Sequence, residues 1–250
     1  MFCVNCHRQI ILMKKAIIVG ASSGIGRQLA ILLAGKNYMV AITGRRKYLL
    51  EELQSQWPDN FIISDFDITN TSIVATKLEN LVAMLGGLDL LILSAGKGDI
   101  NESLDFNIEK QAIDLNIVGF TTVLDWTINY FHQQQCGHLA AITSVAGIRG
   151  GRQAPAYNAS KAFQINYLEG LRQKVTQLKL PIFITDLRPG LVATKPAPVK
   201  IKFLIAPVEK AARQMLHGIE RKRSVVYITQ RWRLIAILIR MLPKQIYNRI

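Results

Sequence analysis

The stretch Gly20-Ala21-Ser22-Ser23-Gly24-Ile25-Gly26 decides the fold expected of this chain. It continues an apolar run at 16–20, predicted to be a buried strand, and it opens an apolar helical stretch at 24–35. Gly20 permits a tight turn, Gly24 lets a phosphate approach the backbone, and Gly26 allows close packing of helix on strand. Because helix N-termini attract anions, the motif predicts a dinucleotide site with contacts from Gly20, Ser22, Ser23, Gly24, Ile25 and Gly26.

The rest of the chain repeats the order of strand and helix. Apolar runs recur at 38–43, 61–64, 88–94, 138–144, 182–187 and 225–229, and helical stretches lie at 46–55, 70–84, 105–133, 155–178 and 207–219. Strict alternation predicts a single Rossmann-type doubly wound α/β domain, with a seven-stranded parallel sheet and helices on both faces. We place this domain at residues 14–230, between an N-terminal extension at 1–13 and a basic, apolar C-terminal helix at 231–250.

Composition narrows the class of protein. The 250 residues are 50% hydrophobic and 19% charged, which suits one globular domain and excludes disorder for most of the chain. The net charge is +14, and residues 200–250 hold twelve basic side chains and two acidic ones. No apolar run approaches the roughly 20 residues of a membrane-spanning helix, and the first residues do not resemble a signal peptide. We therefore expect a cytoplasmic protein.

The N-terminus contains Cys3-Val4-Asn5-Cys6-His7, which matches a haem-attachment pattern. That chemistry requires export, and a structural zinc site requires four ligands where this segment offers three. We interpret the match as accidental and predict no metal site. Met13, just before the first strand, is a credible alternative start.

The second predicted strand indicates which dinucleotide is bound. In folds of this type an acid at the end of this strand holds the ribose of NAD, whereas arginine accommodates the 2′-phosphate of NADP. Here the strand ends Thr43-Gly44-Arg45-Arg46, so we predict NADP(H) bound by Arg45 and Arg46. The alternative is that both arginines merely cap a loop or face solvent. After the third strand, Asp67 and Ile68 are placed to contact adenine, unless Asp67 caps the next helix.

Tyr157 and Lys161 are the candidates for proton transfer. Their i, i+4 spacing places both side chains on one helix face, where the ammonium would favour the phenolate and lower the pKa of Tyr157. Ser144, at the end of the fifth predicted strand, could bind a carbonyl oxygen. Such a Tyr-x-x-x-Lys pair alone is usually a packed tyrosine beside an exposed lysine, but its position after this glycine turn makes coincidence a poor explanation.

The sequence resembles the classical short-chain dehydrogenase/reductase family over residues 14–230. Asn116 in Asn116-Ile117-Val118-Gly119 matches the family's helical asparagine and, with Ser144, Tyr157 and Lys161, completes its catalytic tetrad. The resemblance implies that Tyr157 protonates a carbonyl while nicotinamide provides hydride. It further implies that Lys161 tunes Tyr157 and holds the ribose, that Ser144 polarises the carbonyl, and that Asn116 holds a water. Further cofactor contacts by resemblance are Pro189, Gly190, Val192 and Thr194.

One motif departs from the family pattern. Where the family usually has Asn-Asn-Ala-Gly after the fourth strand, this chain has Leu93-Ser94-Ala95-Gly96. Ser94, Ala95 and Gly96 are still expected at the cofactor, although the adenine-side wall differs. Hydride and proton transfer do not depend on these side chains.

The expected partner is a small carbonyl compound or alcohol. By resemblance, residues 195–206 form the substrate lid, and their apolar composition with three lysines favours a hydrophobic compound. A lid that packs on the body and exposes its lysines explains the composition equally well. The resemblance also implies a homodimer or homotetramer formed through the helices at 105–133 and 155–178.

The tail at 231–250 either covers the substrate pocket or a subunit interface, or contacts a membrane peripherally. Nucleic acid is not expected, because no reading motif accompanies the charge. Two alternatives for the whole protein are a catalytically idle NADP-binding regulator and a basic membrane-surface protein on the same scaffold.

Overall fold

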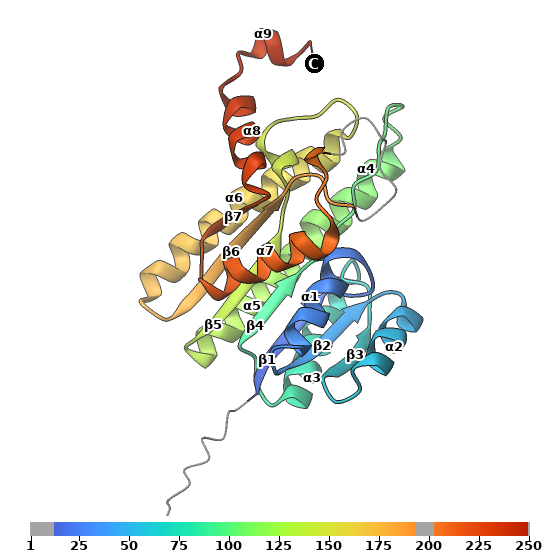
Figure 1. Ribbon diagram of the computed structural model, residues 1–250, viewed down its shortest axis with the longest axis vertical. Coiled ribbons are helices and arrows are strands. Elements are labelled where there is room, and N and C mark those ends of the chain that lie inside the picture. Colours follow the sequence, from blue (N-terminus) through green and yellow to red (C-terminus); the bar gives the residue numbers. More distant parts are fainter. Residues whose placement is uncertain (1–12, 194–202, 250) are drawn as a thin grey trace, which may run out of the picture.

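The computed structural model describes residues 13–193 and 203–249, and a parallel sheet lies at its centre (Figure 1). The sheet has seven strands within these residues, in the order β3-β2-β1-β4-β5-β6-β7, and every neighbouring pair is parallel. The strands are β1 (Lys14–Val19), β2 (Tyr38–Gly44), β3 (Phe61–Asp65), β4 (Leu90–Leu93), β5 (Gly137–Ile142), β6 (Ile182–Pro189) and β7 (Val225–Ile228). The predicted doubly wound Rossmann-type sheet is confirmed.

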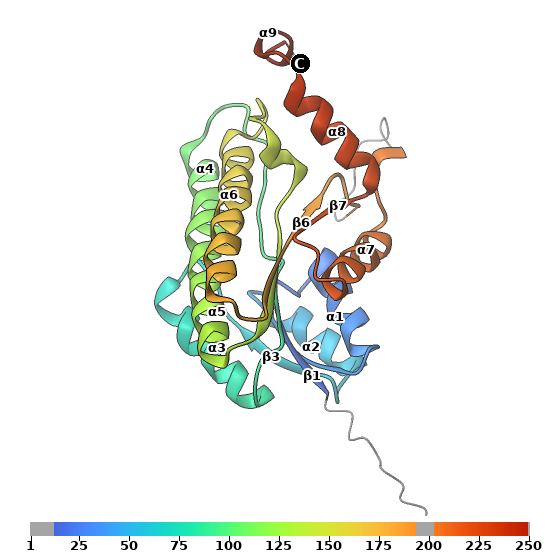
Figure 2. The same ribbon diagram turned by 90° about the vertical axis from the view of Figure 1, so that its left-hand side faces the viewer.

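Helices cover both faces of the sheet, as Figure 2 shows in an edge-on view. One layer contains α3 (Thr71–Leu85), α4 (Phe106–Ile113), α5 (Phe120–Gln134) and α6 (Pro155–Leu178); the other contains α1 (Gly24–Ala34), α2 (Lys47–Gln56) and α7 (Val208–Glu220). Alternation along the strands builds the two cores: Ile17 belongs to the cluster under α3 and α5, and Ile18 to the cluster under α1 and α7. Burial on both faces explains why the strands are apolar almost throughout.

The structure corrects the single helix predicted at 105–133. Between α4 and α5 the chain forms a π-helical segment, η1 (Asp114–Gly119). The helical path therefore continues from α4 to α5, but the helix is wider over these residues. Three strands are also shorter than predicted: β4 ends at Leu93, β5 ends two residues before Ser144, and β7 ends at Ile228. Ser144 instead caps η2 (Val145–Ile148) and accepts a hydrogen bond from the amide of Ala146 at 3.1 Å.

The C-terminal segment lies beyond the carboxyl end of the sheet (Figures 1 and 2). It forms two helices where one was predicted, α8 (Gln230–Met241) and α9 (Lys244–Tyr247), and Pro243 separates them. Within the described residues, no helix is both long and apolar enough to cross a membrane.

Candidate active site

The glycine turn connects β1 to α1 with the geometry its sequence predicts. Gly20 has φ +94° and Gly24 has φ +59°, a region that side-chain-bearing residues seldom adopt. A Cβ at Gly26 would lie 2.0 Å from the carbonyl oxygen of Gly20, so the helix can approach the turn this closely because residue 26 lacks a side chain. The turn is therefore a backbone cradle.

The N-terminus of α1 is open toward this cradle. Ser23 occupies the N-cap without a side-chain cap bond, and the first turn holds no acidic residue. The amide hydrogens and the positive end of the helix dipole thus remain available to an anion. This arrangement fits the pyrophosphate of a dinucleotide.

Arg45 and Arg46 lie next to the cradle but have different partners. Arg46 donates from Nη2 to the hydroxyls of Ser22 and Ser23, at 2.9 and 2.7 Å. Arg45 pairs with the Asp67 carboxylate at 3.5 Å, and its side chain is 64% exposed. Arg46 is thus held beside the predicted phosphate site, whereas Arg45 is largely exposed to solvent and pairs with Asp67.

Asp67 does not cap the following helix. Asn70 occupies the N-cap of α3, whereas Asp67 accepts from the amide of Thr69 at 2.9 Å. Its neighbour Ile68 is buried and touches Gly119, where an added Cβ would lie 2.9 Å from the Ile68 side chain. Ile68 thus links the loop after β3 to η1.

The segment after β4 crosses under the glycine turn. The amides of Ser94 and Ala95 donate to the Val19 carbonyl at 2.8 and 2.9 Å, which continues the pairing of β4 with β1. A Cβ added at Gly96 would lie 3.3 Å from the Lys161 amine, and one added at Gly98 would lie 2.5 Å from the Tyr157 ring. Gly98 was not among the predicted site residues, although a second glycine in Ala95-Gly96-Lys97-Gly98 is a usable signal of close backbone approach.

The four predicted tetrad residues come together at the carboxyl edge of β4 and β5. Asn116 is fully buried in η1; its Nδ2 donates to the Lys97 carbonyl and to Ser160 Oγ, and its Oδ1 accepts from the Lys97 amide. Lys161 is 4% exposed, and its Nζ lies 5.8 Å from the centre of the Tyr157 ring. Tyr157 is hydrogen-bonded to Ser144. The usual alternative, an exposed lysine beside a packed tyrosine, does not describe this pair.

Burial sets the acidity of both groups. It raises the pKa of Tyr157 above its usual value, and the hydrogen bond to Ser144 offsets part of that rise. Burial lowers the pKa of Lys161 to about 8, while the charge of Asp186 acts in the opposite direction. The sequence predicted a Tyr157 pKa lowered by the ammonium, whereas in the structure burial raises this pKa. The phenol stays protonated at neutral pH, as a proton donor requires.

Sequence reasoning missed Gln164, which joins two tetrad members. Its Oε1 accepts from Lys161 Nζ at 2.9 Å, and its Nε2 donates to the Asn116 carbonyl at 2.8 Å. Gln164 is fully buried and lies one turn after Lys161 on α6. The i, i+3 spacing was a usable signal, since it places both side chains on one helix face.

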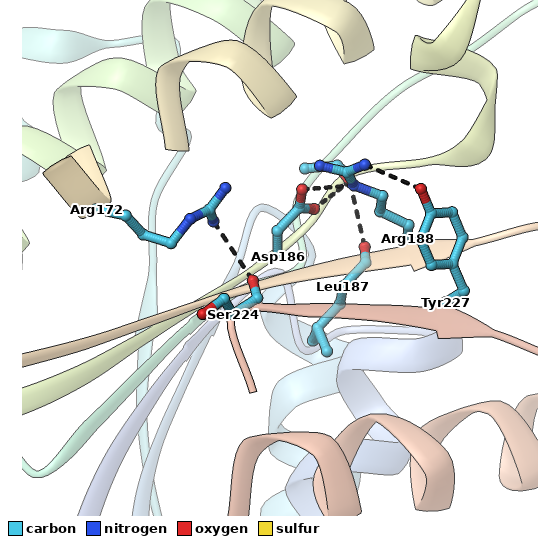
Figure 3. Close-up of polar contacts among 7 residues, drawn as sticks. Arg172, Asp186, Leu187, Arg188, Ser224 and Tyr227 are labelled. Atoms are coloured by element: carbon cyan, nitrogen blue, oxygen red, sulfur yellow. Dashed lines mark hydrogen bonds and ion pairs between the residues drawn. The ribbon is translucent and has the colours of Figure 1, made fainter. Parts of the chain in front are cut away.

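A buried ion pair on β6 was also missed (Figure 3). Asp186 is fully buried and pairs with Arg188 Nε at 2.6 Å, while Thr143 donates to Asp186 at 2.6 Å. Arg188 also donates to the Tyr227 hydroxyl at 3.1 Å, so the guanidinium lies between β6 and β7. Because Thr143 directly precedes Ser144, this network fixes the strand beside the reacting hydroxyl.

The segment after β6 carries the remaining predicted cofactor contacts. Pro189 ends the strand, Gly190 donates its amide to the Ile228 carbonyl at 2.8 Å, and Val192 bridges to Ala206. A Cβ at Gly190 would lie 2.1 Å from the Trp232 ring, so α8 rests directly on this segment. Thr194, most of the lid at 195–206, and Cys3 to His7 lie outside the described residues.

A cavity of about 730 Å³ opens at Tyr157. Its walls come from the loop after β4, the loop before α6, and the C-terminal α9 region. Tyr247 reaches over the loop before α6, where its hydroxyl donates to the Gly150 carbonyl at 2.6 Å and its ring lies 4.0 Å from the Arg149 guanidinium. The part of the tail around α9 therefore helps to enclose the pocket, one of the predicted alternatives.

Comparison with known proteins agrees with this geometry. The model of the family described as short chain dehydrogenase matches residues 14–200, well over half of the chain. The chain belongs to the short-chain dehydrogenase family. A relative described as an uncharacterized oxidoreductase of Myxococcus xanthus is 32% identical over 187 residues, covering 73% of this chain and 73% of that protein. A second uncharacterized oxidoreductase, from Staphylococcus epidermidis, is 29% identical, and the matched region covers 72% of this chain and 79% of that protein. Membership of this oxidoreductase family is thus shown.

Solved structures of similar fold are described with different cofactors. The structure titled "ElxO with NADP Bound" has a TM-score of 0.77 and 20% identity, and covers 87% of this chain and 97% of that one. A short chain dehydrogenase/reductase from Burkholderia phymatum, in complex with NAD, has a TM-score of 0.79 and 18% identity, with coverage of 90% and 92%. At these identities the likeness establishes the fold.

Proposed function

We propose that this short-chain dehydrogenase is an NADP(H)-dependent oxidoreductase that interconverts a carbonyl compound and a secondary alcohol. The observation that carries the proposal is the position of Tyr157. Its phenol lines the cavity, is hydrogen-bonded to Ser144, and lies beside the buried amine of Lys161. A proton donor, a hydroxyl for the carbonyl oxygen and a cation are thus within one small region.

Each residue of the site has a separate role in the proposed reduction of a carbonyl group. When bound, the cofactor supplies the hydride that reduces the carbonyl carbon. Ser144 donates a hydrogen bond to the carbonyl oxygen and polarises it, and Tyr157 delivers the proton to that oxygen as the C–O bond becomes single. Lys161 stabilises the phenolate that remains. Gln164 and the Ile142 carbonyl accept hydrogen bonds from the Lys161 amine and hold it in place, and the Asn116 carbonyl accepts a hydrogen bond from Gln164. In the oxidative direction each transfer is reversed.

The charges around the glycine turn support NADP(H) over NAD(H). The end of β2 presents Arg45 and Arg46 where an NAD-binding fold carries an acid, and both guanidiniums lie next to Ser22 or Asp67. Asp67 neutralises part of the Arg45 charge, so Arg46 is the stronger candidate for the 2′-phosphate. Neighbours of similar fold are described with NADP and with NAD, so the proposal of NADP(H) rests on these side chains.

The cavity suits a hydrophobic substrate that carries a polar group at one end. Ile100 and Leu191 contribute apolar surface, whereas Asn158, Arg152 and Asn248 contribute polar groups. The volume of about 730 Å³ lies within the range of sites that bind drug-sized molecules. We propose a mid-sized carbonyl compound with an apolar body.

The decisive test replaces Tyr157 with phenylalanine. Tyr157→Phe removes the donated proton while keeping the ring, so we expect turnover of a ketone panel with NADPH to fall by about 100-fold or more. Binding of NADPH, measured by fluorescence titration, should be unchanged. Tyr167→Phe is the matched control, because this tyrosine lies on the same helix but bonds to Asp125. Wild-type turnover in Tyr157→Phe would reject the assignment, and a wild type that binds NADPH yet reduces nothing would favour the idle regulator.

A second test addresses the cofactor. Arg45→Ala and Arg46→Ala together should weaken NADPH binding by about 10- to 100-fold, the effect of losing charge-assisted hydrogen bonds, and leave NADH binding nearly unchanged. Arg27→Ala is the control, since Arg27 on α1 pairs with Glu52 at 2.8 Å. Equal losses for NADPH and NADH would show that the 2′-phosphate is bound elsewhere.

A further inference from the structure

The outward face of α8 is an apolar stripe. Leu234, Ile237, Leu238 and Met241 are 47–76% exposed, and their spacing places them within about 100° of the helix surface. The opposite face packs on the body through Trp232, Ile235, Ala236 and Ile239. A helix that is apolar on both faces uses one face for the fold and leaves the other without a partner in the described structure.

Basic side chains flank this stripe on both sides. Helical geometry places Arg231 along one edge and Arg233 with Arg240 along the other. From Arg231 to Arg249 the sequence contains five basic residues and no acidic one. An apolar stripe bordered by cations is the arrangement of helices that lie in the plane of a membrane interface.

The stripe is held rigidly at one end of the molecule. Trp232 fixes the start of α8 through its contact with Gly190 and a hydrogen bond to the Leu204 carbonyl at 3.1 Å. Arg149 fixes the end of α8 by donating to the carbonyls of Ile239 and Leu242, at 3.1 and 2.6 Å. The helix α8 extends beyond the end of the sheet (Figure 2), so the stripe lies at one end of the molecule.

We propose that α8 docks the protein on an anionic membrane surface, with Leu234, Ile237, Leu238 and Met241 in the interface and the arginines at the headgroups. The charge argues against a second copy of the chain as the occupant. A two-fold interface would place the same patch against itself and bring these cations together without a single acid from this segment. Anionic headgroups neutralise them instead.

Vesicle flotation tests the proposal with the full chain. Wild type should float with vesicles of phosphatidylcholine and phosphatidylglycerol, and not with phosphatidylcholine alone. Leu234→Gln with Leu238→Gln should lower the partition coefficient by about tenfold or more, because two apolar side chains no longer enter the interface. Replacing Arg231, Arg233 and Arg240 with glutamine should lower it by about 100-fold, at roughly fivefold for each arginine.

The matched control is Met84→Gln on α3, because Met84 is 63% exposed and far from α8 in the sequence. It should float like wild type, and circular dichroism should show each variant folded. Failure of the wild type to float with anionic vesicles would overturn the proposal, as would unchanged flotation of the leucine double variant. If the wild type does not float and the double variant has a lower solution mass, the stripe belongs to an interface between copies.

Discussion

At the scale of single residues, the most informative group is the buried Lys161 amine. Burial holds its pKa at about 8, below the usual 10.5. Between these values the unfolded chain binds a proton that the folded chain has released, so the free energy of unfolding should rise with pH across this window. Below about pH 8 both states are protonated, and the cost of burying the ammonium is fully present.

This pKa predicts a pH dependence of activity. As the pH rises through about 8, Lys161 loses the charge that stabilises the Tyr157 phenolate, so kcat for carbonyl reduction should fall. The check is a pH profile of kcat combined with urea unfolding at several pH values. Lys161→Met should abolish most turnover and remove the rise in unfolding free energy between pH 8 and 10.5.

Lys174→Met is the matched control, because Lys174 is exposed on the same helix. It should change neither curve. A kcat that stays constant well above pH 8 would show that the charged form of Lys161 is dispensable.

Some residues of the site could be predicted from the sequence and others could not. The spacing of Tyr157 and Lys161 predicted that both lie on one helix face, and the glycines predicted the tight turn after β1. Both predictions succeed because helix periodicity and backbone conformation depend on residues close together in the sequence. Asp186 and Arg188 could not be found this way. Alternate residues on an otherwise apolar strand point to the same face, but the burial of their ion pair depends on Thr143 and Tyr227 from neighbouring strands.

At the scale of elements, the π-helical segment η1 is the main feature that periodicity did not predict. A wider turn changes the hydrogen-bond register of only a few residues, and the apolar pattern continues through it. The periodicity of the sequence is therefore that of one long helix. Here the Asn116 carbonyl accepts from the Gln164 side chain, and its amide group spans to the Lys97 backbone and Ser160. Segments of this kind are frequent at functional sites.

Asn116→Ala tests the role of η1. The substitution removes three side-chain hydrogen bonds in a fully buried position, and it leaves the Lys97 amide and carbonyl without these partners. We expect a loss of about 2 to 3 kcal/mol in the free energy of unfolding and a lower kcat, measured by urea denaturation and steady-state kinetics. Asn129→Ala on the exposed face of α5 should alter neither. Intact kcat in a destabilised Asn116→Ala would assign the residue to the fold alone.

At the scale of the whole molecule, we predict a homodimer or homotetramer formed through the layer of α4, α5 and α6. Val118 in η1 is 45% exposed and Ile113 at the end of α4 is 38% exposed, which leaves apolar surface on this layer. Val118→Arg should lower the mass measured by size-exclusion chromatography with light scattering, because a two-fold interface would place two such cations together. Tyr48→Arg on α2, in the opposite layer, should not. A monomeric wild type would contradict the prediction.

The contact between Gly190 and Trp232 has a consequence for exchanging parts between relatives. The family match ends at residue 200, so the tail is the natural part to graft when building chimeras. Yet the indole fills the space where residue 190 would carry a Cβ. A grafted tail without this aromatic ring would leave a gap beside the predicted cofactor contacts after β6, and a side chain at position 190 of a recipient would clash with the indole of this tail. The loop after β6 and the C-terminal helix must therefore be transferred as one unit.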